Sequence, residues 1–225
     1  MEEKRKIILK ELNQLDGEGK FNFLMEKFII DDILFNKFCT APASTKFHHS
    51  YPGGLYDHTM EVFYGVKNVC EVFPELDMEV VGIGALLHDI GKIYNYQLNN
   101  PKKTGTKIPA LKYKRREEVQ WVGDIVRTLF MVDNYFRKYS PENMDRTDDD
   151  LEKYQHIQHI IASHHGEVRR GWGSSVNPAT AEAQIVHFMD MISSRVRTDV
   201  PEGIGWKEIF SEGFPEVFKK EEKKE

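Results

Sequence analysis

The chain has 225 residues, 40% of them hydrophobic, and a formal net charge of -5. A chain of this size buries about 70% of its unfolded surface, so it needs no disulfide bonds, and we expect Cys39 and Cys70 to be reduced thiols. The negative net charge disfavours a protein that coats nucleic acid, although it leaves room for a local basic patch.

The sequence carries no signal for secretion or membrane insertion. Residues 1–12 are charged throughout and lack the apolar region of a signal peptide. No apolar run approaches the roughly 18 residues that span a bilayer. We therefore expect a soluble, cytoplasmic protein that does not associate with membranes.

Helical periodicity dominates the first half of the chain. Apolar residues predict an amphipathic helix over 3–15, a second helix over 21–38 and, after a loop over 45–54, a third helix over 55–73. Asp77 is placed to cap the next helix, which we expect to run to about residue 90 and to end at Gly91. That helix is apolar on nearly all sides, which is typical of a buried central helix.

The second half continues this pattern. A loop over 94–113, which can hold a small hairpin, precedes a long helix over 117–139, and an acidic connection over 140–150 leads to a helix over 151–165. Gly166 stops that helix, a loop covers 167–177, and Asn177 with Pro178 predicts the start of a last helix that runs to about residue 197. The charged tail over 219–225 is expected to fray.

No internal repeat and no inter-domain linker interrupts the chain, so we expect a single all-α domain. Within it, N-terminal helices over 1–44 should pack on a core over 45–197, and residues 198–225 form a C-terminal extension.

The pair His88-Asp89, at the end of the expected central helix, carries the strongest chemical signal. Burying two ionisable side chains without partners is costly, and a divalent metal ion removes this cost because imidazole and carboxylate are good ligands. Neighbouring residues on a helix point about 100° apart, so the pair could share one ion only at a fraying helix end. Alternatively the carboxylate bridges two ions, or the pair is a buried hydrogen bond without metal.

Four further residues strengthen the metal interpretation. His58 faces inward from its helix, His164 and His165 precede a helix-stopping glycine, and Asp190 lies in an otherwise apolar stretch. Each alone is compatible with an ordinary core or surface position. Together they place imidazole and carboxylate groups on several helices, which is how helical bundles build metal sites.

The order of these residues resembles the HD superfamily of metal-dependent phosphohydrolases over roughly residues 45–195. Three segments are similar to the HD domain of bacterial 3′–5′ exoribonucleases that combine it with an OB-type nucleic-acid-binding domain. They are residues 48–59 (HHSYPGGLYDHT), 163–166 (SHHG) and 182–190 (EAQIVHFMD). The resemblance implies an all-α domain that hydrolyses phosphodiester or phosphomonoester bonds of nucleotides or oligonucleotides.

The resemblance also implies a set of ligands for two divalent ions about 3.5–4 Å apart, which would activate a water molecule. The expected ligands are His58, His88, Asp89, Asp124, His164, His165 and Asp190. Asp89 is the natural bridging ligand, and Lys92 would offset charge that develops on the phosphorus oxygens. Mixed ligands of this kind accept Mn, Fe, Co, Ni or Zn, with Mg also open.

The chain departs from the exoribonuclease pattern in two ways. Residues 1–44 leave no room for an OB-type domain, so we expect no nucleic-acid binding by that route. Asp124 stands where the subgroup has histidine. Its carboxylate is either a metal ligand, which we favour, or hydrogen-bonded, because it shares an expected helix face with Trp121, Thr128, Met131 and Tyr135.

Several residues are candidates for contacts with substrate. We expect such contacts from His48, His49, Lys92, Arg169 and Arg195. His156 and His159 are expected to be exposed or core residues, and His187 either supports a ligand or packs in the core.

A basic segment over 102–116 contains seven Lys or Arg residues and no acidic residue, with tyrosines in and beside it. Such a combination suits single-stranded nucleic acid, although a solvated charged loop is the alternative. Arg169, Arg170 and Trp172 raise the same possibility. The expected partner is therefore a nucleotide or a short single-stranded nucleic acid, and a homo-oligomer is open.

Two other functions remain compatible with these residues. The first is an HD enzyme that acts on mononucleotides or cyclic dinucleotides. The second is a degenerate, non-catalytic HD domain that binds a nucleotide or partner and uses the metal structurally, an alternative that the Asp124 departure keeps open.

Overall fold

The computed structural model describes residues 1–15, 19–45, 48–98, 113–117, 121–141, 148–171 and 173–196. In chain order the helices are α1 (Glu2–Leu12), α2 (Asn22–Ile30), α3 (Asp32–Thr40), α4 (Gly54–Val72), α5 (Met78–Leu87), the 3₁₀ turn η1 (Ile90–Tyr94), α6 (Asp124–Tyr139), α7 (Asp148–Ser163), the 3₁₀ turn η4 (Val168–Arg170) and α8 (Ala181–Val196). The predicted all-α class is confirmed. Among the described residues the only strands form a short antiparallel hairpin, β1 (Tyr96–Leu98) with β2 (Tyr113–Arg115).

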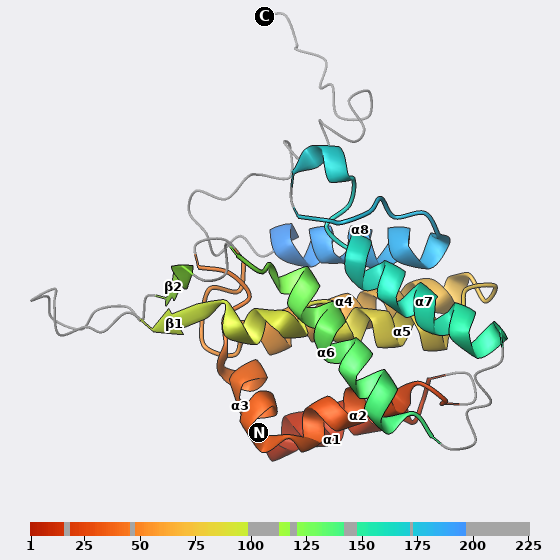
Figure 1. The fold of residues 1–225 in the computed structure, drawn as a ribbon, viewed down its shortest axis with the longest axis horizontal. Coiled ribbons are helices and arrows are strands. Elements are labelled where there is room, and N and C mark those ends of the chain that lie inside the picture. Colours follow the sequence, from red (N-terminus) through yellow and green to blue (C-terminus); the bar gives the residue numbers. More distant parts are fainter. Residues whose placement is uncertain are drawn as a thin grey trace, which may run out of the picture.

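The helices α4 and α5 lie side by side at the centre of the fold, with α8 on one side and α1, α2 and α3 on the opposite side (Figure 1). Every residue of α5 from Glu79 to Leu87 is buried, as its apolar sequence predicts. Gly84 lets α7 approach closely, because a Cβ atom there would lie 2.8 Å from Cγ2 of Ile160. This central pair of helices therefore carries the core, and α7 and α8 pack directly on it.

The N-terminal helices pack into the same hydrophobic core. The prediction of a single helix over 21–38 is wrong, because two helices, α2 and α3, occupy this range. The chain breaks at Asp31, whose backbone is extended and whose carboxylate accepts hydrogen bonds from the amides of Ile33 and Leu34, each at 3.0 Å. Capping by aspartate starts a new helix, α3, where apolar periodicity alone suggested continuity. The break turns α3 so that Phe38 packs edge-to-face on Phe28 of α2.

The central helix begins as predicted but ends early. The Asp77 carboxylate accepts a hydrogen bond from the amide of Val80 at 3.1 Å, which confirms the predicted cap. The helix stops at Leu87 rather than near residue 90, because Asp89 leaves helical geometry with φ -116° and ψ 6°. His88 and Asp89 consequently stand at the break between α5 and η1, where two neighbouring side chains can approach one place.

The boundaries of α6 and α8 also differ from those predicted. Helix α6 starts at Asp124 instead of residue 117, and Trp121, which precedes it, is 80% exposed. Helix α8 starts at Ala181 instead of residue 178, because the Asn177 side chain accepts a hydrogen bond from the amide of Val168 and does not cap the helix. At α8, the contact between Asn177 and Val168 thus replaces the predicted cap.

Several predicted features lie wholly or partly outside the described residues: most of the basic segment over 102–116, the middle of the acidic connection over 140–150, Trp172, and the C-terminal extension over 198–225 with its charged tail. Gly166 adopts a φ of +86°, in agreement with its predicted role at the end of α7. Over the described ranges, no helix combines the length and the apolar character needed to cross a membrane.

Candidate metal centre

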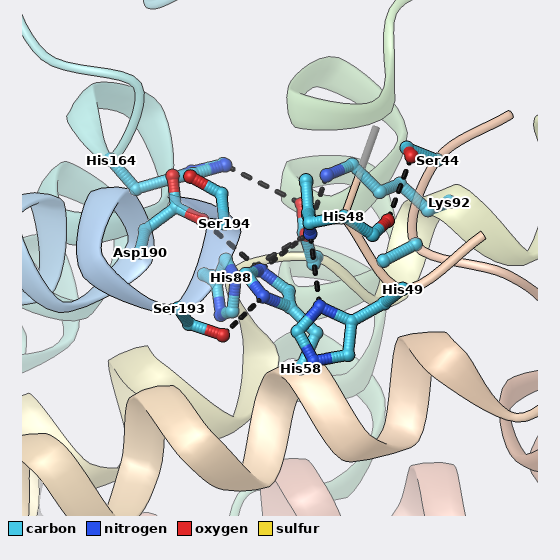
Figure 2. Close-up of polar contacts among 12 residues, drawn as sticks. Ser44, His48, His49, His58, His88, Lys92, His164, Asp190, Ser193 and Ser194 are labelled. Atoms are coloured by element: carbon cyan, nitrogen blue, oxygen red, sulfur yellow. Dashed lines mark hydrogen bonds and ion pairs between the residues drawn. The ribbon is translucent and has the colours of Figure 1, made fainter. Parts of the chain in front are cut away.

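Five ionisable side chains from four parts of the chain lie close together in the interior, and Figure 2 shows His58, His88, His164 and Asp190 among them. His58 comes from α4, His88 and Asp89 from the break after α5, His164 from the end of α7, and Asp190 from α8. All five are buried. Because the polar cluster lies where four elements meet, each helix contributes one or two groups to a shared site.

The first donor group consists of His58, His88 and Asp190. Nε2 of His58 lies 3.0 Å from Oδ1 of Asp190 and 3.3 Å from Nε2 of His88. Oδ2 of Asp89 lies 3.4 Å from Nε2 of each of these histidines. The ligand atoms of the group are close enough to hold one ion.

The second donor group consists of Asp89, His164 and His165, whose ligand atoms lie within 4.8 Å of one another. Here Oδ1 of Asp89 faces Nε2 of His164 at 3.5 Å. The two oxygens of Asp89 therefore face different groups, Oδ2 toward the first and Oδ1 toward the second. This is the arrangement that the predicted bridging carboxylate requires.

Hydrogen bonds to the backbone determine which ring nitrogens of two histidines carry the proton. Nδ1 of His88 lies 2.6 Å from the carbonyl oxygen of Ala85, and Nδ1 of His164 lies 2.8 Å from that of Ile161. A carbonyl oxygen only accepts, so each Nδ1 must donate. In the neutral ring, Nε2 then offers a lone pair to the cluster, and this is the nitrogen that faces Asp89.

When the ring of His164 is neutral, its Nε2 and Oδ1 of Asp89 are two acceptors that face each other. Nε2 of His164 and Oδ1 of Asp89 are buried and find no hydrogen-bond partner among the described residues. Buried polar atoms without partners are unfavourable, and a cation between them satisfies both. The donor set of imidazole and carboxylate fits a divalent transition metal, and histidines fixed through the other ring nitrogen are typical of metal ligands.

The electrostatics also favour bound positive charge. Burial alone would raise the pKa values of Asp89 and Asp190, but Lys92 and His88 hold the first, and His58 the second, well below the usual range. Burial would lower the pKa of His58, yet hydrogen bonds to Asp190 and Asp89 raise it. Both carboxylates therefore stay ionised and attract a cation.

Lys92 adds a fixed positive charge next to the bridging carboxylate. Its Nζ lies 2.6 Å from Oδ2 of Asp89, and the side chain is buried. Burial would lower the pKa of Lys92, but the charges of Asp89 and then Asp124 raise it. The side chain is consequently an ammonium group at the edge of the donor cluster.

Asp124 lies in the first turn of α6, half-buried and outside both donor groups. The apolar face that supported its prediction is incomplete, because Trp121 precedes the helix and is exposed. Asp124 is near enough to Lys92 to raise the pKa of that side chain. A ligand role for Asp124 stays a prediction.

His48 and His49 border the cluster. Their ring centroids lie 4.8 Å and 5.4 Å from that of His58, and the three histidines form a further group of close ligand atoms. His49 has a φ of 48°, a conformation that is uncommon for a residue other than glycine. Burial, with the charges of His58 and Lys92, lowers the pKa of His48 to about 2.

The remaining candidates lie in other surroundings. Arg169 is exposed on η4 and pairs with Glu167, whereas Arg195 is half-buried near the end of α8. His187 contacts the backbone of one cluster residue, because its Nδ1 lies 2.8 Å from the carbonyl oxygen of His164.

Two residues near the cluster, Ser193 and Glu61, were not predicted from the sequence. The hydroxyl oxygen of Ser193 lies 2.9 Å from Nδ1 of His58. The same hydroxyl donates a hydrogen bond to Oε2 of Glu61 at 2.8 Å. A signal existed, because each follows a predicted ligand by three residues on the same helix, a spacing that places side chains on one face. Serine and glutamate at such positions are common for other reasons, so spacing alone does not single them out.

The described residues form an all-α bundle whose buried histidine and aspartate cluster, at a helix break, has ligand groups that could hold a metal ion. A sequence model described as HD domain matches residues 55–195, well over half of the chain. The chain therefore belongs to the HD domain family, whose members are generally metal-dependent hydrolases, and the predicted superfamily is confirmed. The chain has no match among solved structures.

Proposed function

We propose that this protein hydrolyses phosphate ester bonds of nucleotides or short oligonucleotides, using water activated by two divalent ions. The observation that carries the proposal is the position of Asp89, whose two oxygens face two separate donor groups. Divalent ions bound there would polarise a phosphoryl oxygen and lower the pKa of bound water.

The residues divide the work as follows. His58, His88 and Asp190 would hold one ion, His164 and His165 the other, and Asp89 would contact both. All of these side chains except the half-buried His165 are buried, and the low polarity of the interior strengthens electrostatic interactions inside the site.

Lys92 is the group best placed to act on the substrate. In the structure its ammonium group neutralises Oδ2 of Asp89. A metal ion at that oxygen would take over this role, which frees the ammonium group to turn toward the phosphoryl oxygens. Charge that develops there would then be offset within a buried environment. His48 and His49, next to His58, would contact the phosphate from the other side.

A nucleotide or short single strand is supported by the neighbourhood of the site. The strand β1 follows the turn that carries Lys92, and its partner strand ends at Arg115, which is exposed together with Arg116. Exposed guanidinium groups bind phosphate backbones. The similarity of three segments to the exoribonuclease HD domain points the same way, toward oligonucleotides rather than mononucleotides or cyclic dinucleotides.

The test is turnover by purified protein that is stripped of metal and reloaded with Mn²⁺. Substrates would be bis-p-nitrophenyl phosphate, a short single-stranded RNA, a nucleoside monophosphate and a cyclic dinucleotide. We expect metal-dependent hydrolysis of the diester and the RNA, and none by Asp89→Ala. Metal binding without turnover of any of these esters would instead identify a non-catalytic HD domain.

A further inference from the structure

We propose that Glu61 and Ser193 form a hydrogen-bonded relay that fixes the tautomer and the orientation of His58. Glu61 and Ser193 are then positioning residues for a metal-binding imidazole. The inference deepens the proposed function, since it rests on His58 as a ligand.

The direction of the relay follows from the number of protons available. The Ser193 hydroxyl has one hydrogen, and its oxygen lies 2.8 Å from Oε2 of Glu61 and 2.9 Å from Nδ1 of His58. A carboxylate only accepts hydrogen bonds, so the hydroxyl donates to Glu61. Ser193 must then accept from Nδ1 of His58, which places a proton on Nδ1 and, in the neutral ring, leaves a lone pair on Nε2.

That lone pair is directed into the first donor group. Nε2 of His58 lies 3.0 Å from Asp190 and 3.4 Å from Asp89. If the proton were on Nε2 instead, the ring could not bind a metal ion at this position. The relay therefore decides whether His58 is available as a ligand.

The position of His58 in its helix explains why it needs an external partner. His88 and His164 follow the last residues of α5 and α7, where carbonyl oxygens three residues earlier can accept from Nδ1. His58 lies inside α4, where such carbonyls are used by the helix itself. A hydroxyl from the neighbouring helix α8 supplies the acceptor that α4 does not.

Glu61 connects the relay to a second part of the site. Its Oε2 lies 3.1 Å from Nε2 of His49, whose side chain is completely buried and whose backbone has the unusual positive φ. The Glu61 carboxylate thus joins α4, α8 and the turn that carries His48 and His49. We expect Glu61 to hold that turn beside His58 as well as to orient Ser193.

The experiment compares three variants of the full-length chain, Ser193→Ala, Glu61→Ala and Glu61→Gln, with two matched controls. Ser194→Ala removes the next hydroxyl, which donates to the Met191 carbonyl of its own helix. Glu71→Ala removes an exposed carboxylate of α4. Mn²⁺ affinity is measured by calorimetry, and the tautomer of His58 by NMR of ¹⁵N-histidine-labelled, metal-free protein.

The relay predicts a roughly 10–100-fold loss of Mn²⁺ affinity for Ser193→Ala and Glu61→Ala. Glu61→Gln should lie between these variants and the parent, because its amide oxygen still accepts from Ser193. The parent should show His58 protonated on Nδ1, and Ser193→Ala should show a mixture of tautomers. Both controls should match the parent.

The proposal is overturned if Ser193→Ala and Glu61→Ala bind Mn²⁺ as tightly as the parent, or if His58 keeps one tautomer in both. Should the alanine variants fail to fold, Glu61→Gln decides alone, since it replaces one atom of a partly exposed side chain. A parent that binds Mn²⁺ but hydrolyses no ester would contradict the proposed function. The Mn²⁺ affinities and the His58 tautomers of the variants would still test the relay.

Discussion

Nζ of Lys92 lies 2.6 Å from Oδ2 of Asp89, the same oxygen that lies 3.4 Å from Nε2 of both His58 and His88. A buried ammonium group and a divalent ion would therefore act on one carboxylate oxygen. Under the proposed function, Lys92 would compete with the first ion when substrate is absent and would contact the phosphate when substrate is bound.

Replacement of Lys92 by methionine should separate these two effects. Metal affinity should rise or stay equal, because a positive charge beside the ligands is removed. The turnover number should fall by roughly 10²–10³-fold, the usual effect of removing one group that stabilises transition-state charge. Calorimetry with Mn²⁺ and hydrolysis of bis-p-nitrophenyl phosphate measure the two quantities, with Lys6→Ala on the exposed face of α1 as control. Unchanged turnover would remove Lys92 from the catalytic assignment.

The purified chain should contain one to two transition-metal ions, and the double variant His88→Ala, Asp89→Ala should contain fewer and be inactive. It should also lose the rise in melting temperature that metal gives the parent, because binding to the folded state stabilises it. Elemental analysis and melting with and without Mn²⁺ test this. A parent that neither holds metal nor binds added Mn²⁺ at micromolar concentration would contradict the metal centre.

Asp124→Ala tests whether the carboxylate near Lys92 is also a ligand. If it is, the variant should lose one ion more readily than the other, because His58, His88, Asp89 and Asp190 remain. Asp124→His should retain activity and shift the preference from Mn toward Co, Ni or Zn, since imidazole is the softer ligand. Metal content and activity across a metal panel give the answer. Parent-like stoichiometry and ranking in Asp124→Ala would limit Asp124 to its charge interaction with Lys92.

Gly84 sets the approach of the two helices that lead to His88 and His164. Gly84→Val places methyl groups where Ile160 packs, 2.8 Å from the position of a Cβ atom. Overpacking of this kind costs about 1–3 kcal/mol of unfolding free energy, and a displaced α7 should weaken Mn²⁺ binding. Ile160→Ala in the same chain should restore part of both. Denaturant unfolding and calorimetry measure them, and equal affinity in Gly84→Val would show that the site tolerates movement of α7.

The sequence by itself determined the all-α class, the central buried helix and the five buried residues of the cluster, whereas Asp124, which was predicted with them, lies outside both donor groups. The reason is local: the segment around Val80 and Leu86 is apolar on every side, so an ionisable pair at its end has no place on the surface. The spacing of His58, His164 and Asp190 on separate helices completed a recognisable pattern, and the family match over residues 55–195 agrees with it.

Element boundaries were less predictable, because side-chain hydrogen bonds compete with periodicity. At Asp31 a capping carboxylate divides what apolar spacing presents as one helix. At Asn177 a predicted cap is used instead by the amide of Val168, nine residues earlier in the chain. Each outcome depends on where a second segment lies, which the local sequence does not state.

Only the tertiary structure determined which atoms of the cluster face one another. That Asp89 directs one oxygen to each donor group depends on the helix break at Leu87 and on the packing of α7 and α8 around it. The proton on His58 depends on Ser193, a residue 135 positions away in the sequence. Hydrogen bonds act over about 3 Å, so only the packing of α8 against α4 determines which atom of His58 faces the metal site.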